Sequence, residues 1–74
     1  MKKVNVKEVF IKDGYVNVRL DDNENYEMIY RAAKGVYWDN KLSTLFFKGV
    51  VPHEEALRFI SEAMENEYYV KLIF

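Results

Sequence analysis

Residues 8–19 read EVFIKDGYVNVR and carry the strongest local signal in the chain. Asp13-Gly14 lies between two apolar-rich runs, and this dipeptide is typical of a type I′ turn, whose two central residues both need positive φ. The sequence therefore predicts a β-hairpin with a two-residue turn. The implied register pairs Lys12 with Tyr15, Ile11 with Val16, Phe10 with Asn17, Val9 with Val18 and Glu8 with Arg19.

One face of this hairpin is apolar, and the other carries a favourable charge pair between Glu8 and Arg19. The apolar face consists of Val9, Ile11, Val16 and Val18. Val4 and Val6 are out of phase with Val9 and Ile11. A β-bulge is therefore expected near Lys7–Glu8, since an extra residue would restore the alternation.

A polar segment, residues 21–25, follows the hairpin and resembles a helix start. Asp21 with Glu24 three residues later has the spacing of a capping box. An amphipathic stripe then recurs at i, i+3, i+4 and i+7; its members are Tyr26, Ile29, Tyr30 and Ala33. Gly35 suits the position after a helix end. These features predict a first helix over about residues 23–34.

A second hairpin is expected from the β-rich runs 36–38 and 43–47. Its register stays open, because either Asp39-Asn40 or Asn40-Lys41 could form the turn. A shift of one residue would exchange the two faces of each strand, so either Tyr37 or Trp38 would face away from the helices.

The last third of the chain predicts a helix and a strand. Pro52 suits the first helical position, and the acidic Glu54 and Glu55 suit the first turn. The apolar stripe of this helix is Ala56, Leu57, Ile60, Ala63 and Met64. After Glu67 the pattern changes to period two, which is typical of a strand.

Together these elements predict a single α+β domain spanning residues 1–74. Its order is ββαββαβ, which is the ferredoxin-like βαββαβ plan with an added N-terminal strand. We expect a two-layer sandwich, in which two helices cover one face of an antiparallel sheet. The strand order stays open. In the ferredoxin-like plan the strand 15–20 already has a neighbour on each side, and the added N-terminal strand must take the place of one of these neighbours.

Composition excludes several classes of protein. Half of the 74 residues are apolar, 16% are aromatic and 31% are charged, a profile that excludes a disordered chain. No run of 18 residues avoids charge, so no membrane span is expected. The chain has no cysteine and one histidine, which leaves no thiolate site and no histidine cluster for a metal. We expect no metal and no cofactor, and a cytoplasmic protein without a secretory signal.

The sequence nominates no catalytic residue, so the protein is not expected to be an enzyme. His53 would need a nucleophile and an orienting carboxylate, and no residue is singled out for either role. The simpler interpretation is that His53 lies at the start of the second helix and packs against the end of a strand. The carboxylate clusters at 21–27 and 62–67 are explained by helix ends and solvated faces, and they lack the spacing of an EF-hand.

The candidate functional surface is the sheet face turned away from the helices. Its predicted residues are Phe10, Tyr15, Arg19, Tyr37, Tyr69, Lys71 and Ile73. Aromatic side chains of this kind suit protein interfaces, and the uncharged end of the last strand, 72–74, suits edge pairing. The hypothesis is a small non-enzymatic interaction or regulatory module that binds a protein partner or a second copy of itself.

Single-stranded nucleic acid is the alternative partner, because bases stack on exposed aromatics. It is less favoured, since the net charge is −1 and phosphate binding needs a concentrated positive surface. A small-ligand regulatory domain is a third hypothesis, based on fold analogy. An excess of residues with AT-rich codons suggests an AT-rich genome, such as that of a low-GC bacterium, an archaeon or one of their viruses. An accessory protein of a virus or mobile element is among the expectations.

Overall fold

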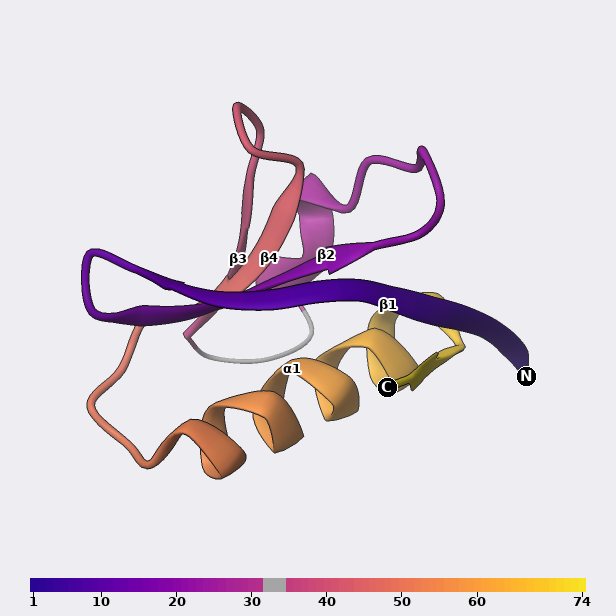
Figure 1. Ribbon diagram of the computed structural model, residues 1–74. Helices are drawn as coiled ribbons and strands as arrows, with labels where there is room; N and C mark the ends of the chain where they lie inside the picture. The colour runs from indigo at the N-terminus through magenta and orange to yellow at the C-terminus, as the bar shows by residue number, and fades with distance from the viewer. Residues whose placement is uncertain (32–34) are drawn as a thin grey trace.

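The computed structural model describes residues 1–31 and 35–74, which form one five-stranded sheet, an α-helix and a short 3-10 helix. The elements are β1 (Lys2–Lys12), β2 (Tyr15–Leu20), η1 (Glu27–Arg31), β3 (Val36–Asp39), β4 (Thr44–Phe47), α1 (His53–Tyr68) and β5 (Val70–Ile73). The strand order is β3-β4-β2-β1-β5. Figure 1 shows α1 running along one side of this twisted sheet, which we call the inner face. The opposite side is called the outer face.

The first hairpin is confirmed, with its turn, register and bulge. Asp13 and Gly14 have φ of 53° and 83°, as a type I′ turn requires. All five predicted pairs are present, from Lys12 with Tyr15 to Glu8 with Arg19. The register shifts between Val6 and Glu8, at the predicted bulge. Local turn chemistry therefore fixes this part of the sheet.

The predicted first helix is wrong. Residues 27–31 form a single 3-10 segment, in which the Ile29 N–H donates to the carbonyl of Tyr26 at 3.0 Å. Two members of the predicted stripe, Tyr26 and Ile29, are buried, whereas Tyr30 is 53% exposed. Ala33, the fourth member, lies outside the described residues. A 3-10 turn places residues three apart on the same side. It can therefore bury both Tyr26 and Ile29 without a longer helix.

The predicted capping box is also replaced by other contacts. The side-chain oxygen of Asn25 accepts the N–H of Glu27 at 2.8 Å. The carboxylate of Asp22 accepts the hydroxyl hydrogen of Tyr26 instead of capping a helix. Local side-chain bonds of this kind compete with helix formation, which explains why the acidic segment starts no α-helix.

The ferredoxin-like arrangement, with two helices on an antiparallel sheet, is overturned by the topology. The sheet is mixed, because β5 pairs parallel with β1, from Lys2–Val70 to Asn5–Ile73, while every other neighbouring pair is antiparallel. β2 already lies between β1 and β4. The chain therefore crosses the inner face as α1 and adds β5 outside β1.

The second hairpin has a longer turn than either predicted one. Asp39 pairs with Thr44, and residues 40–43 form the loop. The side-chain oxygen Oδ1 of Asp39 accepts the N–H groups of Lys41 at 2.9 Å and of Leu42 at 3.0 Å. This register puts Tyr37 on the outer face opposite Phe46, and Trp38 on the inner face opposite Leu45.

The second predicted helix is present as α1, with Pro52 as the N-cap residue rather than the first helical residue. Ala56, Ile60, Ala63 and Met64 are buried against the sheet. The helix ends at Tyr68, and Tyr69 forms a left-handed C-cap with φ of 57°. The last strand therefore begins at Val70, one residue after the predicted surface residue Tyr69.

The core lies between α1, η1 and the inner face of the sheet. Ile29, Val36, Leu45, Ile60 and Met64 are fully enclosed in it. The Tyr26 ring packs edge-on against Trp38 and Tyr68, at centroid distances of 5.6 and 4.8 Å. In the described ranges, no helix has the length and apolar character needed to cross a membrane.

Candidate interaction surface

The outer face carries a row of side chains that runs across four strands. Phe10 of β1 pairs with Asn17 of β2, Asn17 with Phe46 of β4, and Phe46 with Tyr37 of β3. Paired residues share one face of a sheet, so these four side chains lie side by side on the outer face. Two of the predicted surface residues, Phe10 and Tyr37, are thereby connected through Asn17 and Phe46.

Phe46 is the centre of the aromatic part of this row, and it was not among the residues predicted for this surface. Its ring lies 5.9 Å from the ring of Tyr37 and 6.3 Å from the ring of Tyr15, with interplanar angles of 31° and 33°. The register of the second hairpin was the missing information. Once Asp39 pairs with Thr44, Phe46 must share a face with Tyr37.

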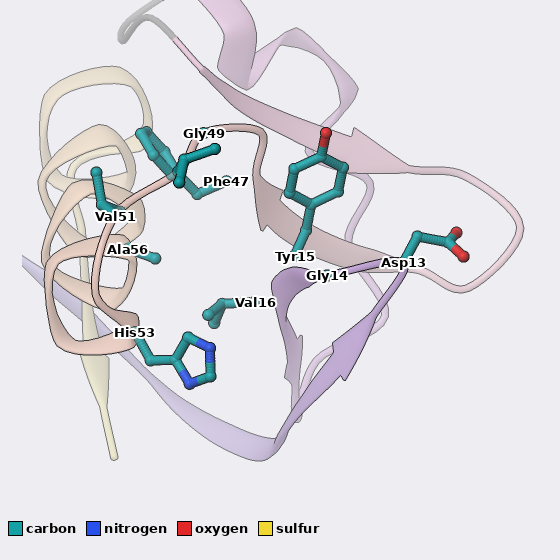
Figure 2. Close-up of a pocket in the computed structure, with 10 residues that line it drawn as sticks. Asp13, Gly14, Tyr15, Val16, Phe47, Gly49, Val51, His53 and Ala56 are labelled. Carbon is teal, nitrogen blue, oxygen red and sulfur yellow. The ribbon is translucent and has the colours of Figure 1, made fainter.

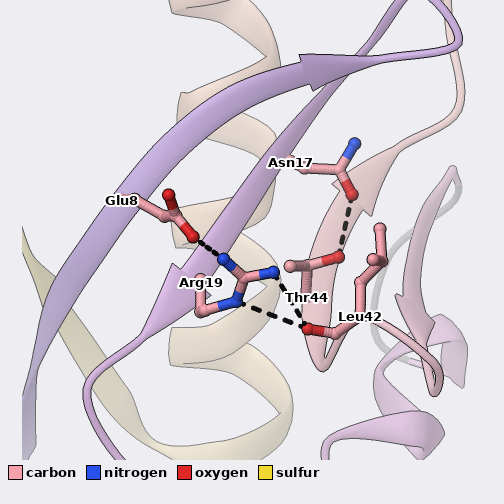
Figure 3. Close-up of polar contacts among 5 residues, drawn as sticks. All are labelled: Glu8, Asn17, Arg19, Leu42 and Thr44. Carbon is pink, nitrogen blue, oxygen red and sulfur yellow. Dashed lines mark hydrogen bonds and ion pairs between the residues drawn. The ribbon is translucent and has the colours of Figure 1, made fainter.

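A buried polar pair supports the aromatic rings. The Thr44 hydroxyl donates to the side-chain oxygen of Asn17 at 2.8 Å (Figure 3), and the Asn17 amide donates to the carbonyl of Tyr15 at 3.1 Å. Asn17 and Thr44 are both buried, although they lie on the face opposite α1. Hydrogen bonding makes that burial tolerable, because an unpaired polar group would be costly there.

Arg19 connects three parts of the outer face. Its guanidinium pairs with the Glu8 carboxylate and donates to the carbonyl of Leu42 from Nε at 3.4 Å and Nη2 at 3.3 Å (Figure 3). The guanidinium carbon also lies 5.3 Å from the centre of the Phe10 ring. Arg19 therefore holds the β3–β4 loop against the sheet, and its charge is already matched by Glu8.

A hollow of about 200 Å³ lies at the hairpin end of this face. Tyr15, Asn17 and Phe46 line it, together with two cations and two carboxylates; these are Lys12, Lys48, Asp13 and Asp39. The pKa of Asp39 is lowered, first by the N–H of Leu42 and further by the N–H of Lys41. The carboxylate is thus held in its charged form, and the charges around the hollow balance.

The other three predicted surface residues lie elsewhere. Tyr69 is the C-cap of α1 and is 70% exposed. Lys71 and Ile73 lie on β5, opposite Lys3 and Asn5 of β1. Lys3 precedes Phe10 by seven residues, which is about 20 Å along a strand. The structure therefore brings together Phe10, Tyr15, Arg19 and Tyr37, and separates them from Tyr69, Lys71 and Ile73.

A second hollow, of about 290 Å³, separates the first hairpin from the start of α1. His53 lines it and directs its imidazole toward Val16 (Figure 2). The backbone of Gly14 and the apolar side chains of Val51 and Ala56 complete much of the wall. Asp13 and Tyr15 also line the hollow, and no hydrogen bond joins His53 to a carboxylate or a hydroxyl in the parts of the chain that the structure describes.

Metal ligands are not clustered in the part of the fold that the structure describes. Within residues 1–31 and 35–74, no three His, Cys, Asp or Glu side chains are close enough together to hold an ion. Comparison with protein-family models, with curated proteins and with solved structures found no match. Function must therefore be inferred from the geometry of the outer face and of the sheet edges.

Proposed function

We propose that the protein is a non-enzymatic, cytoplasmic interaction module that binds a protein partner on the outer face of its sheet. The observation that carries this proposal is the aromatic row across β1, β2, β4 and β3, which α1 leaves uncovered. Phe10, Phe46 and Tyr37 are its aromatic members, and the Tyr15 ring lies beside Phe46 on the same face. Tyrosine and phenylalanine supply large contact areas at low entropic cost, and they are enriched in protein interfaces.

The row is also well prepared for binding. Asn17, which lies between Phe10 and Phe46, is held by a hydrogen bond from Thr44, and Arg19 holds the neighbouring loop in place. A surface whose side chains are already ordered loses less entropy when a partner binds. The mixed charges around the hollow of Tyr15 and Phe46 favour a partner with both polar and apolar groups, as protein surfaces have.

Single-stranded nucleic acid is the second candidate, and the contact of Arg19 with the Phe10 ring favours it. A guanidinium beside aromatic rings is a common platform for bases. The charge arrangement argues the other way. Glu8 neutralises Arg19, and Asp13 and Asp39 accompany Lys12 and Lys48. Little positive charge is left on this face to attract phosphates.

The test places a photo-reactive phenylalanine analogue at Tyr37 in cells of the source organism. Tyr37 is 41% exposed on the outer face, and Tyr30, with 53% exposure, is the matched control position on η1. We expect a discrete protein adduct from position 37 only, lost when Tyr15→Ala is added to the same chain. Identical adducts from both positions, or adducts that survive Tyr15→Ala, would contradict the proposal.

The nucleic-acid alternative is tested by fluorescence anisotropy with a labelled oligothymidylate at low salt. The proposal predicts no saturable binding. Binding that weakens in both Tyr15→Ala and Tyr37→Ala, stays intact in Tyr69→Ala and falls steeply with salt would establish the alternative instead.

A further inference from the structure

β1 is paired along only part of its outer edge. β5 covers Lys2 to Asn5, and no described residue pairs with that edge from Val6 to Lys12. Val9 and Ile11 lie in this open segment with 44% and 48% of their surface exposed. α1 packs against β2, β3, β4, β5 and η1, and β1 is not among the described elements that it contacts. The open edge is therefore unpaired, and it carries exposed apolar side chains next to charged ones.

The hairpin determines which main-chain groups this edge presents. In a two-residue hairpin, the residues that flank the turn exchange both main-chain hydrogen bonds, and bonded pairs then alternate with non-bonded ones. Lys12, Phe10 and Glu8 consequently direct their N–H and C=O groups toward β2. Val9 and Ile11 direct theirs toward the open edge, so an added strand must bond to these two residues.

We propose that the open edge of β1 pairs with the same edge of a second copy of this chain, antiparallel and about a twofold axis at Phe10. Val9 of each copy then bonds to Ile11 of the other, so the main-chain groups of these two residues are satisfied. Glu8 lies opposite Lys12 of the second copy at both ends of the pairing, and Phe10 faces Phe10 on the outer face. Opposite charges and aromatic rings in cross-strand positions stabilise a sheet.

Other registers and edges lack this self-complementarity. On the edge strand β3, Asp39 is the one charged side chain, and no cation of that strand could face it in a second copy. Centring the axis on Val9 would place Glu8 opposite Phe10, and centring it on Ile11 would place Lys12 opposite Phe10. Both registers lose the two charge pairs. On β5, the antiparallel registers would place Lys71 opposite Lys71, Ile73 or Tyr69 of a second copy, and never opposite a carboxylate side chain. Charge complementarity therefore selects β1 and the register centred on Phe10.

In the proposed register, the pairing would end before the residues that β5 covers. The Asp13-Gly14 turn of the second copy reaches the position opposite Lys7, whereas β5 pairs no further along β1 than Asn5. Phe74, which is 63% exposed, would lie beside that turn. The two sheets would become continuous, with the Phe10 pair at the junction of two outer faces. The inference rests on the β1 edge. In the dimer, the proposed binding face would extend across the outer faces of both copies and so be twice as wide.

The test uses two charge reversals, K12E and E8K, that are complementary only between chains. In a dimer of K12E alone, two carboxylates would face each other at both ends of the pairing. In a dimer of E8K alone, two ammonium groups would do so. A 1:1 mixture of the two variants would restore both opposite-charge pairs.

Sedimentation equilibrium from about 10 μM to 1 mM suits a small interface of this kind. We expect the wild type to dimerise in this range. Each variant alone should dimerise at least about tenfold more weakly, and the mixture should associate like the wild type.

Two controls keep the result interpretable. Circular dichroism of each variant shows that it is folded, which matters for E8K because Glu8 also pairs with Arg19 in its own chain. Recovery in the mixture cannot arise from a folding defect. A wild type that stays monomeric at 1 mM, variants that dimerise as well as the wild type, or a mixture that fails to associate would each overturn the inference. Because the Tyr37 adduct is measured separately, either proposal can fail while the other stands.

Discussion

The Thr44 hydroxyl donates to the side-chain oxygen of Asn17 at 2.8 Å, and both residues are buried on the sheet face opposite α1. Polar groups at an ordinary open sheet surface would bond to water. Here Phe46 lies beside Asn17 and packs against the Tyr15 ring, and Arg19 holds the loop that precedes Thr44. The outer face is thus a second, thin layer of packing, and we expect its order to depend on this hydrogen bond.

A double-mutant cycle should measure that dependence. Thr44→Val leaves the Asn17 oxygen without its donor, and Asn17→Leu leaves the Thr44 hydroxyl without its acceptor, so each should lower the free energy of unfolding by about 1–3 kcal/mol. The double variant should be more stable than the sum of the two losses predicts, since two apolar groups leave no unpaired partner. Urea denaturation provides the measurement. Strictly additive losses would show that the two residues act independently.

The sequence determines the fold where the decisive interactions are local. Asp13-Gly14 fixes a turn, the turn fixes the register, and the phase change at Lys7–Glu8 fixes the bulge. The helix α1 is likewise encoded by a long, regular apolar stripe. Such elements are predictable because neighbouring residues contain all the information that they need.

The remaining elements depend on contacts between distant residues. The segment after Asp22 has a helical stripe, but Tyr26 is held by Asp22 and by the rings of Trp38 and Tyr68. Period-two alternation in Val70–Ile73 predicts a strand without saying which edge it joins. For the same reason Phe46 was missed, because its place on the outer face follows from the pairing of Asp39 with Thr44.

A pair of glycines tests the packing around Phe47. Gly14 and Gly35 have similar φ, 83° and 89°, so an alanine at either position meets the same backbone strain. A Cβ at Gly14 meets nothing within 4 Å, whereas a Cβ at Gly35 would lie 2.9 Å from Cε1 of Phe47. Gly35→Ala should therefore cost about 1–3 kcal/mol more than Gly14→Ala in thermal or urea unfolding. Equal losses would mean that Phe47 moves aside freely.

The acid stability of the fold should depend on Asp39. Two main-chain N–H groups lower its pKa, so the folded state binds a proton less readily than the unfolded state does. The resulting stabilisation is present above the unfolded pKa of about 3.9 and is lost as the pH falls through the lower, folded value. Asp39→Asn keeps the acceptor oxygen without the charge and should lose less stability between pH 5 and pH 2. Asp21→Asn, at an exposed position, serves as control and should follow the wild type.

The stability of the fold at alkaline pH should depend on Tyr26, and here stability is lost as the pH rises rather than as it falls. Burial raises the pKa of the Tyr26 phenol, and its hydrogen bond to Asp22 raises it further. The folded state therefore disfavours the phenolate. The stabilisation is complete below the unfolded tyrosine pKa of about 10 and is lost as the pH rises above it toward the folded value.

Tyr26→Phe separates the two contributions of this side chain. Without the hydroxyl, the variant should lose about 1 kcal/mol at pH 7, because the bond to Asp22 is gone. Its stability should then decline less than that of the wild type between pH 9.5 and 11.5. Part of the decline should persist, since burial also raises the pKa of Tyr68. Tyr30→Phe, at an exposed position, is the control and should match the wild type in urea denaturation across this range. If the unfolding free energy of Tyr26→Phe declined with pH as steeply as that of the wild type, Tyr26 would not control the loss of stability at alkaline pH.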